Sequence, residues 1–237
     1  MKQVNTIPVI EIRFPKNGKI RSRKVVSRSN ASNSGKYPSW KMQRMMQWES
    51  IHEGNAMRIL DATPCVISFN EQPCEIIYTL NGIQRRHYPD FMVTERNRCE
   101  FWEVKTECDA NDPEVVERTH HLMNALPTYG YGYRMVLAET LATQPRLDNV
   151  KRLNKLGRHP VSAIEQETIR RFFIREPVLQ WGTLEAKSPV ALRHISRLIL
   201  EGKLSINLHQ PINAASQIHS NFNVHNEETC HGSRTLL

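Results

Sequence analysis

The fold is decided by residues 88–105, which read YPDFMVTERNRCEFWEVK. Apolar and β-branched residues on either side of a polar turn at residues 94–98 predict two strands that pair with each other. Asp90 lies on the first strand, and Glu103 and Lys105 lie on the second. Because side chains alternate along a strand, Glu103 and Lys105 project from the same face. Strand pairing then brings Asp90 to the same end of the sheet.

A cluster of two acids and a lysine suits the hydrolysis of a phosphodiester. Converging carboxylates hold a hard Mg²⁺ ion and leave positions open for a phosphate and a water. A lysine adds positive charge beside the phosphate. The structural alternative is a cross-strand salt bridge between Lys105 and either acid, usually worth less than about 1 kcal/mol. The apolar neighbours Phe101 and Trp102 favour the site, but the pattern is short and also occurs by chance.

The surrounding segments predict an α/β fold. A helix is expected from Ser39 or Trp40 through about Leu60, and Asn81-Gly82 predicts a two-residue hairpin turn. Asp112-Pro113 predicts an N-cap and the first residue of another helix. The expected order is helix 39–60, strands 65–69, 75–80, 85–93 and 99–105, helix 112–126 and strand 133–138. An antiparallel hairpin thus leads into a crossover and a parallel pairing, which is the plan of a restriction-endonuclease-like core, a mixed sheet flanked by helices.

A small, mainly helical, winged-helix-like domain is expected to follow this core. Helical patterns at residues 162–175 and 189–200 precede an alternating segment at residues 204–208. Arg193, His194 and Arg197 are expected on the polar side of the last helix. A helical cap domain that binds no DNA is the alternative. The predicted domains are a basic flexible arm at 1–35, the core at 36–140, a linker at 141–160, the winged-helix-like domain at 161–213 and a polar tail at 214–237.

Positive charge is concentrated at the start of the chain. Residues 1–40 contain nine Lys or Arg against one acid, Glu11, which accounts for the whole formal net charge of +8. Such an arm can lie along phosphates and release counterions. A solvated tail has the same composition, so the two interpretations stay open.

Composition excludes several other classes of protein. The five cysteines are Cys65, Cys74, Cys99, Cys108 and Cys230; none forms a C-x-x-C pair, so we expect free thiols rather than a zinc site. The adjacent His120 and His121 lack a carboxylate or cysteine at ligand spacing. No apolar run is long enough to span a membrane and the start lacks the plan of a secretory signal. We therefore expect a cytoplasmic protein.

A third acid is expected from the helix that precedes the strands. The segment from Trp48 to Glu53 reads WESIHE and offers Glu49 and Glu53. Ser50 and Glu53 also form an S-x-x-E capping box, whose side chains satisfy amides at a helix end. The residues alone leave open which glutamate is a ligand.

These motifs resemble the TnsA family, whose amino-terminal domain is a nuclease of the PD-(D/E)xK kind. The resemblance is carried by residues 48–53, 60–64, 66–73, 88–91 and 103–105, in order and spacing. It implies that Glu53 is the first metal ligand, that Asp90 is the central one, and that Glu103 and Lys105 are the paired positions on the next strand. The backbone carbonyl of Val104 is implied as a further ligand. Residues 198–212 more thinly resemble the family's carboxy-terminal winged-helix domain.

The resemblance also implies a function and partners. It implies an endonuclease subunit that depends on Mg²⁺, with Mn²⁺ as a substitute and two ions in the site. This subunit hydrolyses the phosphodiester at the 5′ ends of a transposon, in double-stranded DNA, during cut-and-paste transposition in bacteria. The implied partners are a TnsB-like DDE transposase and a TnsC-like AAA+ ATPase. The alternatives are a stand-alone restriction, repair or junction-resolving nuclease, and a catalytically silent DNA-binding assembly protein.

Overall fold

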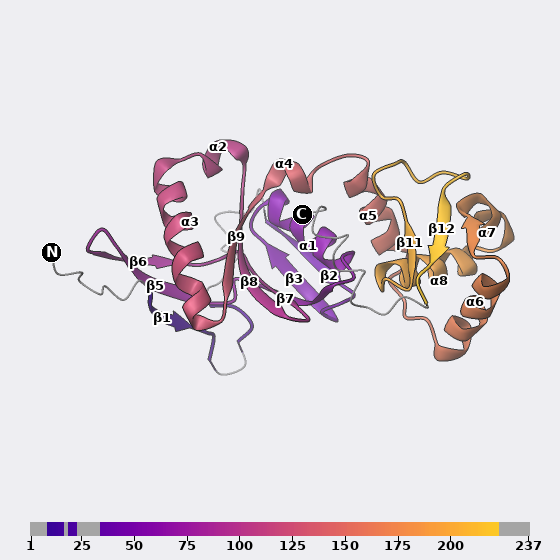
Figure 1. Ribbon diagram of the computed structural model, residues 1–237, viewed down its shortest axis with the longest axis horizontal. Helices are drawn as coiled ribbons and strands as arrows, with labels where there is room; N and C mark the ends of the chain where they lie inside the picture. Colours follow the sequence, from indigo (N-terminus) through magenta and orange to yellow (C-terminus); the bar gives the residue numbers. More distant parts are fainter. Residues whose placement is uncertain (1–8, 17–18, 23–33, 223–237) are drawn as a thin grey trace. The chain divides into compact units, whose positions relative to one another are not determined.

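The computed structural model describes residues 9–16, 19–22 and 34–222, and these divide into two compact units (Figure 1). The first unit contains residues 1–37, 45–54 and 67–140, and the second contains residues 38–44, 55–66 and 141–237. Helix α1 (Ile51–Asp61) and strand β4 (Val66–Glu71) therefore contribute residues to both units.

A four-stranded sheet of order β4-β7-β8-β9 runs through the first unit. Strands β7 (Phe91–Glu95) and β8 (Arg98–Lys105) pair antiparallel around the predicted polar turn. Strand β9 (Gly132–Leu137) then pairs parallel with β8. The chain between β8 and β9 carries α2 (Glu107–Ala110), α3 (Pro113–Ala125) and the short 3-10 helix η1 (Leu126–Tyr129). The predicted hairpin, crossover and parallel pairing are confirmed.

A second sheet of order β1-β5-β6 is antiparallel throughout. Strands β5 (Glu75–Leu80) and β6 (Ile83–His87) are joined by Asn81 and Gly82, whose φ angles of 53° and 76° confirm the predicted hairpin turn. The single strand predicted at residues 85–93 was wrong. It is two strands in two sheets, β6 and β7, because Pro89 between them has no N–H to donate to a ladder.

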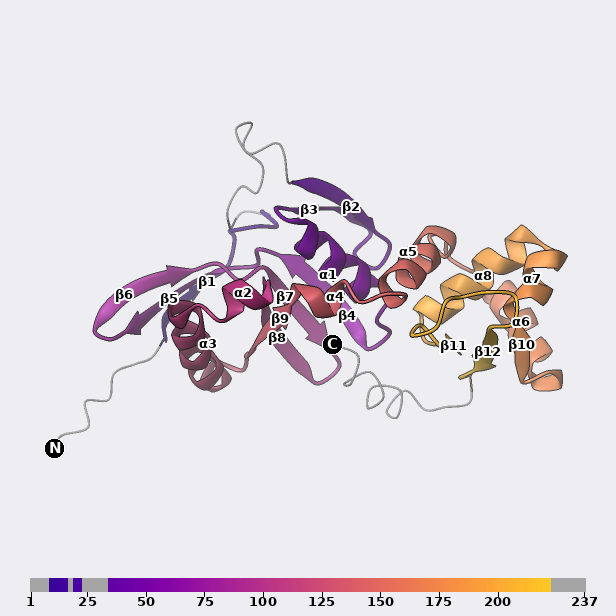
Figure 2. The same cartoon turned by 90° about the horizontal axis from the view of Figure 1, so that it is seen from above.

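Helix α3 begins as the sequence predicts and packs against β9, as Figures 1 and 2 show. The Asp112 side chain caps it by accepting hydrogen bonds from the N–H groups of Glu114 and Val115. Its apolar face is buried in the core of the first unit. The fully or nearly fully buried members of this core are Val9, Cys74, Ile76, Tyr78, Phe101, Leu122, Ala125 and Leu126.

The helix predicted from residue 39 begins only at Ile51. The preceding residues form a hairpin of β2 (Gly35–Ser39) and β3 (Arg44–Trp48), with Gln43 at a positive φ of 52° in the turn. Met46 is fully buried on β3, whereas its neighbour Met45 is 53% exposed. This alternation belongs to a strand, and it was mistaken for part of a helical period.

The basic arm is partly built into the first unit. Strand β1 (Val9–Arg13) pairs with β5, and Val9 is fully buried. Farther along, Arg21 forms an ion pair with Glu71 at 3.4 Å. The prediction of a flexible arm is therefore wrong for these residues. Residues 1–8, 17–18 and 23–33 lie outside the described part of the chain.

The second unit has helices around a small antiparallel sheet. Helix α6 begins at the predicted position, with a capping box between Ser162 and Glu165. The sheet has the order β10-β12-β11. The expectation of a winged-helix-like domain stays a prediction. The elements are α5 (Arg146–Leu156), α6 (Ala163–Arg175), β10 (Val178–Gln180), α7 (Trp181–Lys187), α8 (Pro189–Leu200), β11 (Leu204–Ile206) and β12 (Gln217–Ser220), after the short α4 (Ala138–Leu141).

Three expectations about the second unit were wrong. The predicted linker contains α5, whose Leu147, Val150 and Leu153 are buried at a spacing of three residues. The predicted tail contains the central strand β12, whose Ile218 is fully buried. Arg197 is buried instead of lying on a polar face, because its guanidinium stacks on Trp40 in this unit, 3.9 Å from the ring centroid.

Two expectations from composition can be compared with the structure. Within the described residues, Cys65, Cys74, Cys99 and Cys108 are not joined in disulfides, in agreement with the prediction, and Cys230 lies outside these residues. In residues 9–16, 19–22 and 34–222, no helix has the length and apolar character needed to cross a membrane.

Candidate active site

The register of two strands places the predicted acids opposite each other. Phe91 on β7 pairs with Trp102 on β8. Asp90 precedes Phe91 and Glu103 follows Trp102, so an antiparallel ladder extended by one residue makes Asp90 and Glu103 cross-strand neighbours on one face. Asp90 itself lies just outside β7, in a bend. The predicted approach of these two acids is confirmed.

The Asp90 carboxylate is held by backbone and repelled by other acids. Its Oδ2 accepts a hydrogen bond from the Val104 N–H at 2.7 Å. Burial raises the pKa of Asp90 well above its usual value, and the negative charges of Glu103 and Glu53 raise it further. The structure therefore brings Glu53, like Glu103, within electrostatic range of Asp90.

Glu53 lies in the first turn of α1 and closes a helix cap. The Ser50 hydroxyl accepts a hydrogen bond from the Glu53 N–H at 3.2 Å, and Glu53 Oε2 accepts one from the Glu49 N–H at 2.8 Å. Ser50 also donates its hydroxyl to Glu53 Oε1 at 3.2 Å. The structural role predicted for Glu53 is thus confirmed. Glu49 contributes its backbone to the same cap, and its side chain is not among the groups that raise the pKa of Asp90.

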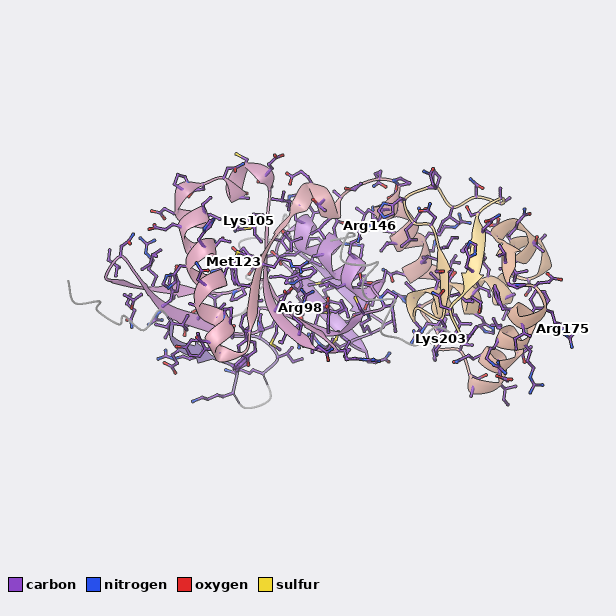
Figure 3. The ribbon with its side chains drawn as sticks, in the orientation of Figure 1. Arg98, Lys105, Met123, Arg146, Arg175 and Lys203 are labelled. Atoms are coloured by element: carbon purple, nitrogen blue, oxygen red, sulfur yellow. The ribbon has the colours of Figure 1, made fainter. Side chains whose placement is uncertain are left out.

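Glu103 is the acid most surrounded by positive charge. Its side chain is 4% exposed, and its Oε1 lies 3.2 Å from Lys105 Nζ and 3.3 Å from Arg118 Nη2. Lys105 is at the end of β8 (Figure 3), and Arg118 projects from α3. The predicted side-by-side placement of Glu103 and Lys105 is confirmed. The salt bridge that was the structural alternative is also present.

Three residues at this site were missed by the sequence analysis. Besides Arg118, His87 places its Nε2 3.3 Å from Glu103 Oε2, and the Tyr133 hydroxyl lies 2.9 Å from the same nitrogen. Burial and the charge of Glu103 raise the pKa of Tyr133, so its hydroxyl stays protonated. The order of strands could have indicated Tyr133, because β9 was expected beside β8. Nothing in the sequence distinguishes Arg118 or His87 from other basic residues.

The chemistry of these side chains suits a hard divalent cation. Glu53, Asp90 and Glu103 offer only oxygen atoms, the donors that Mg²⁺ prefers. Their mutual repulsion, which raises the pKa of Asp90, is what a cation among them offsets. In the described part of the chain, however, no three His, Cys, Asp or Glu side chains already stand at metal-cluster spacing. Glu53 and Glu103 instead face protein donors.

The mixed sheet, its flanking helices and this cluster define a nuclease-like α/β core. A family model described as TnsA-like endonuclease N terminal matches residues 63–125. The matched segment includes Asp90, Glu103 and Lys105 and ends within α3. It confirms the resemblance to a TnsA-like nuclease and indicates a nuclease of the transposase type. No curated protein matches the chain.

Proposed function

We propose that this chain is a Mg²⁺-dependent endonuclease subunit of a heteromeric transposase, which hydrolyses the phosphodiester at the 5′ ends of a transposon. The observation that carries the proposal is that Asp90 and Glu103 share one face of a strand pair, while the charges of Glu103 and Glu53 both act on the Asp90 carboxylate. Acids that repel one another inside a protein destabilise it unless a cation or a proton compensates them. The matched family supplies the reaction class.

Glu53, Asp90, Glu103 and the Val104 carbonyl are the proposed ligands. The N–H and C=O of one residue on a strand face the same neighbour. Because the Val104 N–H donates to Asp90, its carbonyl faces the Asp90 side as well. We expect two Mg²⁺ ions in the site, with Mn²⁺ as a substitute. When bound, such ions would supply Lewis acidity and make hydroxide accessible near neutral pH.

Lys105 is proposed to place its ammonium beside the scissile phosphate. Its Nζ lies 3.2 Å from Glu103 Oε1, and its side chain is about one-third exposed. A substrate phosphate can therefore reach the ammonium from solvent, whereas Glu103 behind it is buried. An ammonium fixed in this position stabilises the charge that develops on the phosphoryl oxygens.

The metal requirement can be tested directly. Nicking is expected with Mg²⁺ or Mn²⁺ and only weakly with Ca²⁺, whose looser coordination holds DNA without the geometry that the reaction requires. Cleavage that persists in a chelator excludes the mechanism. Binding of Mn²⁺ can also be measured without an activity assay, from the rise in the unfolding temperature that it causes.

The proposed partners are a TnsB-like DDE transposase and a TnsC-like AAA+ ATPase. Beyond residue 40 the chain is formally neutral, and neither unit shows an obvious base-reading motif, which supports sequence specificity that comes from elsewhere. Partners that tether the subunit at a transposon end raise the local concentration of DNA. The protein alone is therefore expected to cut DNA poorly.

The deciding experiment compares nicking by this protein alone and with its proposed transposase and ATPase partners, on plasmids with and without transposon ends. Partner-dependent nicks at the 5′ ends that disappear with Asp90→Ala support the proposal. Equal cleavage in all four mixtures supports a stand-alone nuclease instead. Binding without any cleavage in the complete mixture supports a catalytically silent assembly protein.

A further inference from the structure

The second unit contains a cavity of about 190 Å³ that the proposed nuclease function does not use. Its wall is formed by the end of α1, the start of α5 and the segment after β11. The cavity is small beside the roughly 300 Å³ or more of sites for drug-sized ligands, so it accommodates a group of only a few atoms. The lining residues are Ile59, Ala62, Thr63, Pro64, Arg146, Val150, Ile206, Asn207, Leu208 and His209.

Arg146, at the first position of α5, is the charged residue that lines this cavity (Figure 3). It is 7% exposed, and burial alone lowers the pKa of its guanidinium, with no neighbouring acid acting to raise it. Among residues 9–16, 19–22 and 34–222, no side chain forms a hydrogen bond or ion pair with this guanidinium. In the described chain the side chain is therefore mostly covered and has no acid beside it, while its guanidinium nitrogens are not among the buried atoms without a partner and so face the cavity and its water.

An arginine that is mostly covered by protein and has no acid beside it is uncommon in a folded protein. A charge in a low-dielectric surrounding is normally paired with an opposite charge, and an exception requires a physical reason. Arg197, another buried arginine of this unit, follows the usual pattern, because its guanidinium bonds the Glu201 carboxylate at 2.6 Å. Arg146 is also at the start of α5, where the positive end of the helix dipole adds to its charge. An anion beside it would therefore be stabilised by both.

The part of the cavity wall that follows β11 is held in place by one side chain of α5. Asn149 donates from its side-chain amide to the carbonyls of Leu208 and Gln210, both at 2.8 Å. Its Oδ1 accepts a hydrogen bond from the Ile212 N–H at 3.2 Å. These three bonds fix the segment after β11 against α5. The cavity is therefore formed before any ligand arrives, which lowers the entropy lost on binding.

We propose that this cavity binds a carboxylate carried on a short apolar stem, with Arg146 as its counter-ion. The guanidinium presents parallel N–H donors that match the two oxygens of a carboxylate. Ile59, Val150 and Leu208 provide apolar contacts for the stem. A DNA phosphate is disfavoured, because a phosphodiester lies between two sugars and retains much of its hydration, whereas most of this wall is apolar.

The test uses the complete protein and n-butyrate as the probe. Calorimetry is expected to detect binding of butyrate but not of butyramide, its uncharged counterpart. Arg146→Gln is expected to weaken the affinity for butyrate by about tenfold or more, the effect of one charge-assisted hydrogen bond. Arg175→Gln removes an exposed arginine from the same unit and should leave the affinity unchanged.

A second measurement does not depend on any variant folding correctly. In the wild-type protein, butyrate is expected to shift the backbone amide NMR signals of Val150, Asn207 and Leu208. Arg146→Lys, which keeps the charge, should retain more affinity than Arg146→Gln. Equal binding of butyrate and butyramide, or amide shifts elsewhere only, overturns the proposal.

Two sources of carboxylate are separated by a further comparison. An acetylated, amidated pentapeptide with a central glutamate between leucines is titrated beside butyrate, with the glutamine peptide as its control. Tighter binding of the glutamate peptide assigns the cavity to an acidic side chain of a protein partner, and tighter binding of butyrate assigns it to a free acid. If inorganic phosphate or a DNA duplex displaces butyrate more effectively than either, the site is a phosphate site and the proposal is wrong.

Discussion

Asp61 in the second unit and Asp90 in the first are aspartates whose surroundings treat their negative charges in opposite ways. Asp61 is fully buried and accepts hydrogen bonds from the Ser39 hydroxyl at 2.7 Å and from the N–H groups of Trp40 and Lys41 at 3.2 and 3.3 Å. These donors stabilise the charge and hold the turn after β2. Asp61 is a structural residue.

Asp90 accepts a hydrogen bond from the Val104 N–H. Most of the other groups around it disfavour its negative charge. Burial and the negative charges of Glu103 and Glu53 raise its pKa, while Lys105 acts weakly in the opposite direction. A carboxylate that its own protein leaves poorly compensated has a use for an external cation. The comparison teaches that burial alone does not identify a functional acid, whereas the balance of donors and acids around it does.

The largest expected effect comes from Asp90→Asn. This change should lower the rate of nicking by about 10² to 10³-fold, because it removes charge that stabilises the transition state. The metal-free protein should unfold at the same or a higher temperature, since repulsion by Glu103 and Glu53 is relieved. Added Mn²⁺ should no longer raise the unfolding temperature. Nicking assays and thermal unfolding with and without Mn²⁺ measure both effects.

A clear contradiction would be near-normal nicking by the Asp90→Asn protein. A fall in the stability of the metal-free variant would also count against the comparison, because it would make Asp90 a structural residue like Asp61.

Lys105→Ala should lower the nicking rate by about 10²-fold while the protein still binds Mn²⁺ and DNA. Its ammonium acts on the phosphate and is not a metal ligand. Arg134→Ala is a suitable control, because Arg134 lies on the neighbouring strand β9 and pairs with Glu100 rather than with Glu103. If both variants lose nicking equally, the charge of Lys105 has no special role.

Local sequence rules predicted much of the first unit. The turn at Asn81-Gly82 and the cap at Asp112 depend on residues that favour one local geometry, so both could be located from the sequence. A short polar turn joins β7 and β8, so the approach of Asp90 to Glu103 could be predicted from their pairing. The hairpin of β2 and β3 was missed, because the Asp61 carboxylate that holds its turn lies about twenty residues away in sequence.

The candidate site was predictable only in its acids and lysine. Asp90, Glu103 and Lys105 share a short motif, and Glu53 came from a resemblance. Arg118 reaches Glu103 from α3, fifteen residues along the chain. This contact depends on how α3 packs against β9, which no local pattern encodes. Buried charges such as Arg146 are equally invisible, since the sequence does not reveal which arginine lacks an acid.

Asp61→Ala should lower the free energy of unfolding by about 1 to 3 kcal/mol, because it leaves buried donors without an acceptor. Asp61→Asn keeps one acceptor oxygen and should have a smaller effect. Chemical denaturation measures both. The rise in unfolding temperature caused by Mn²⁺ should be the same as in the wild-type protein. If Mn²⁺ no longer raised the unfolding temperature of the Asp61 variants, Asp61 would resemble Asp90 and the comparison would fail.

Glu53→Gln should weaken Mn²⁺ binding by about tenfold, and Glu49→Gln should leave it nearly unchanged. Of these two glutamates, Glu53 but not Glu49 is among the groups that raise the pKa of Asp90, so Glu53 is the one placed in the proposed set of ligands. A glutamine at position 53 keeps an oxygen that can accept the Glu49 N–H, which preserves the helix cap. Calorimetric titration with Mn²⁺ measures the affinities, and the opposite order would show that the wrong glutamate was chosen.

The smallest expected effect concerns the basic arm at residues 1–35. The arm contains eight Lys or Arg, and the net charge of the whole chain is +8. Deleting the arm would remove β1 and its buried Val9 from the first unit, so neutralising exposed cations is the cleaner test. Lys16 and Lys19 are exposed in the described part of the arm. Replacing both with glutamine should weaken DNA binding a few-fold, because two fewer cations release counterions from the phosphates.

The slope of log affinity against log salt should then become shallower by about 1.8, or 0.9 for each lost phosphate contact. The matched control replaces Lys155 and Arg175, two exposed cations of the second unit, with glutamine. An effect confined to the arm variant means that the arm lies along DNA. Equal effects from both pairs mean that DNA affinity depends only on the total charge of the protein. An unchanged slope in the arm variant means that these lysines stay solvated in the complex. In the last case the cations of the arm serve the fold, as Arg21 does when it pairs with Glu71, and the acids around Asp90 meet DNA without help from the arm.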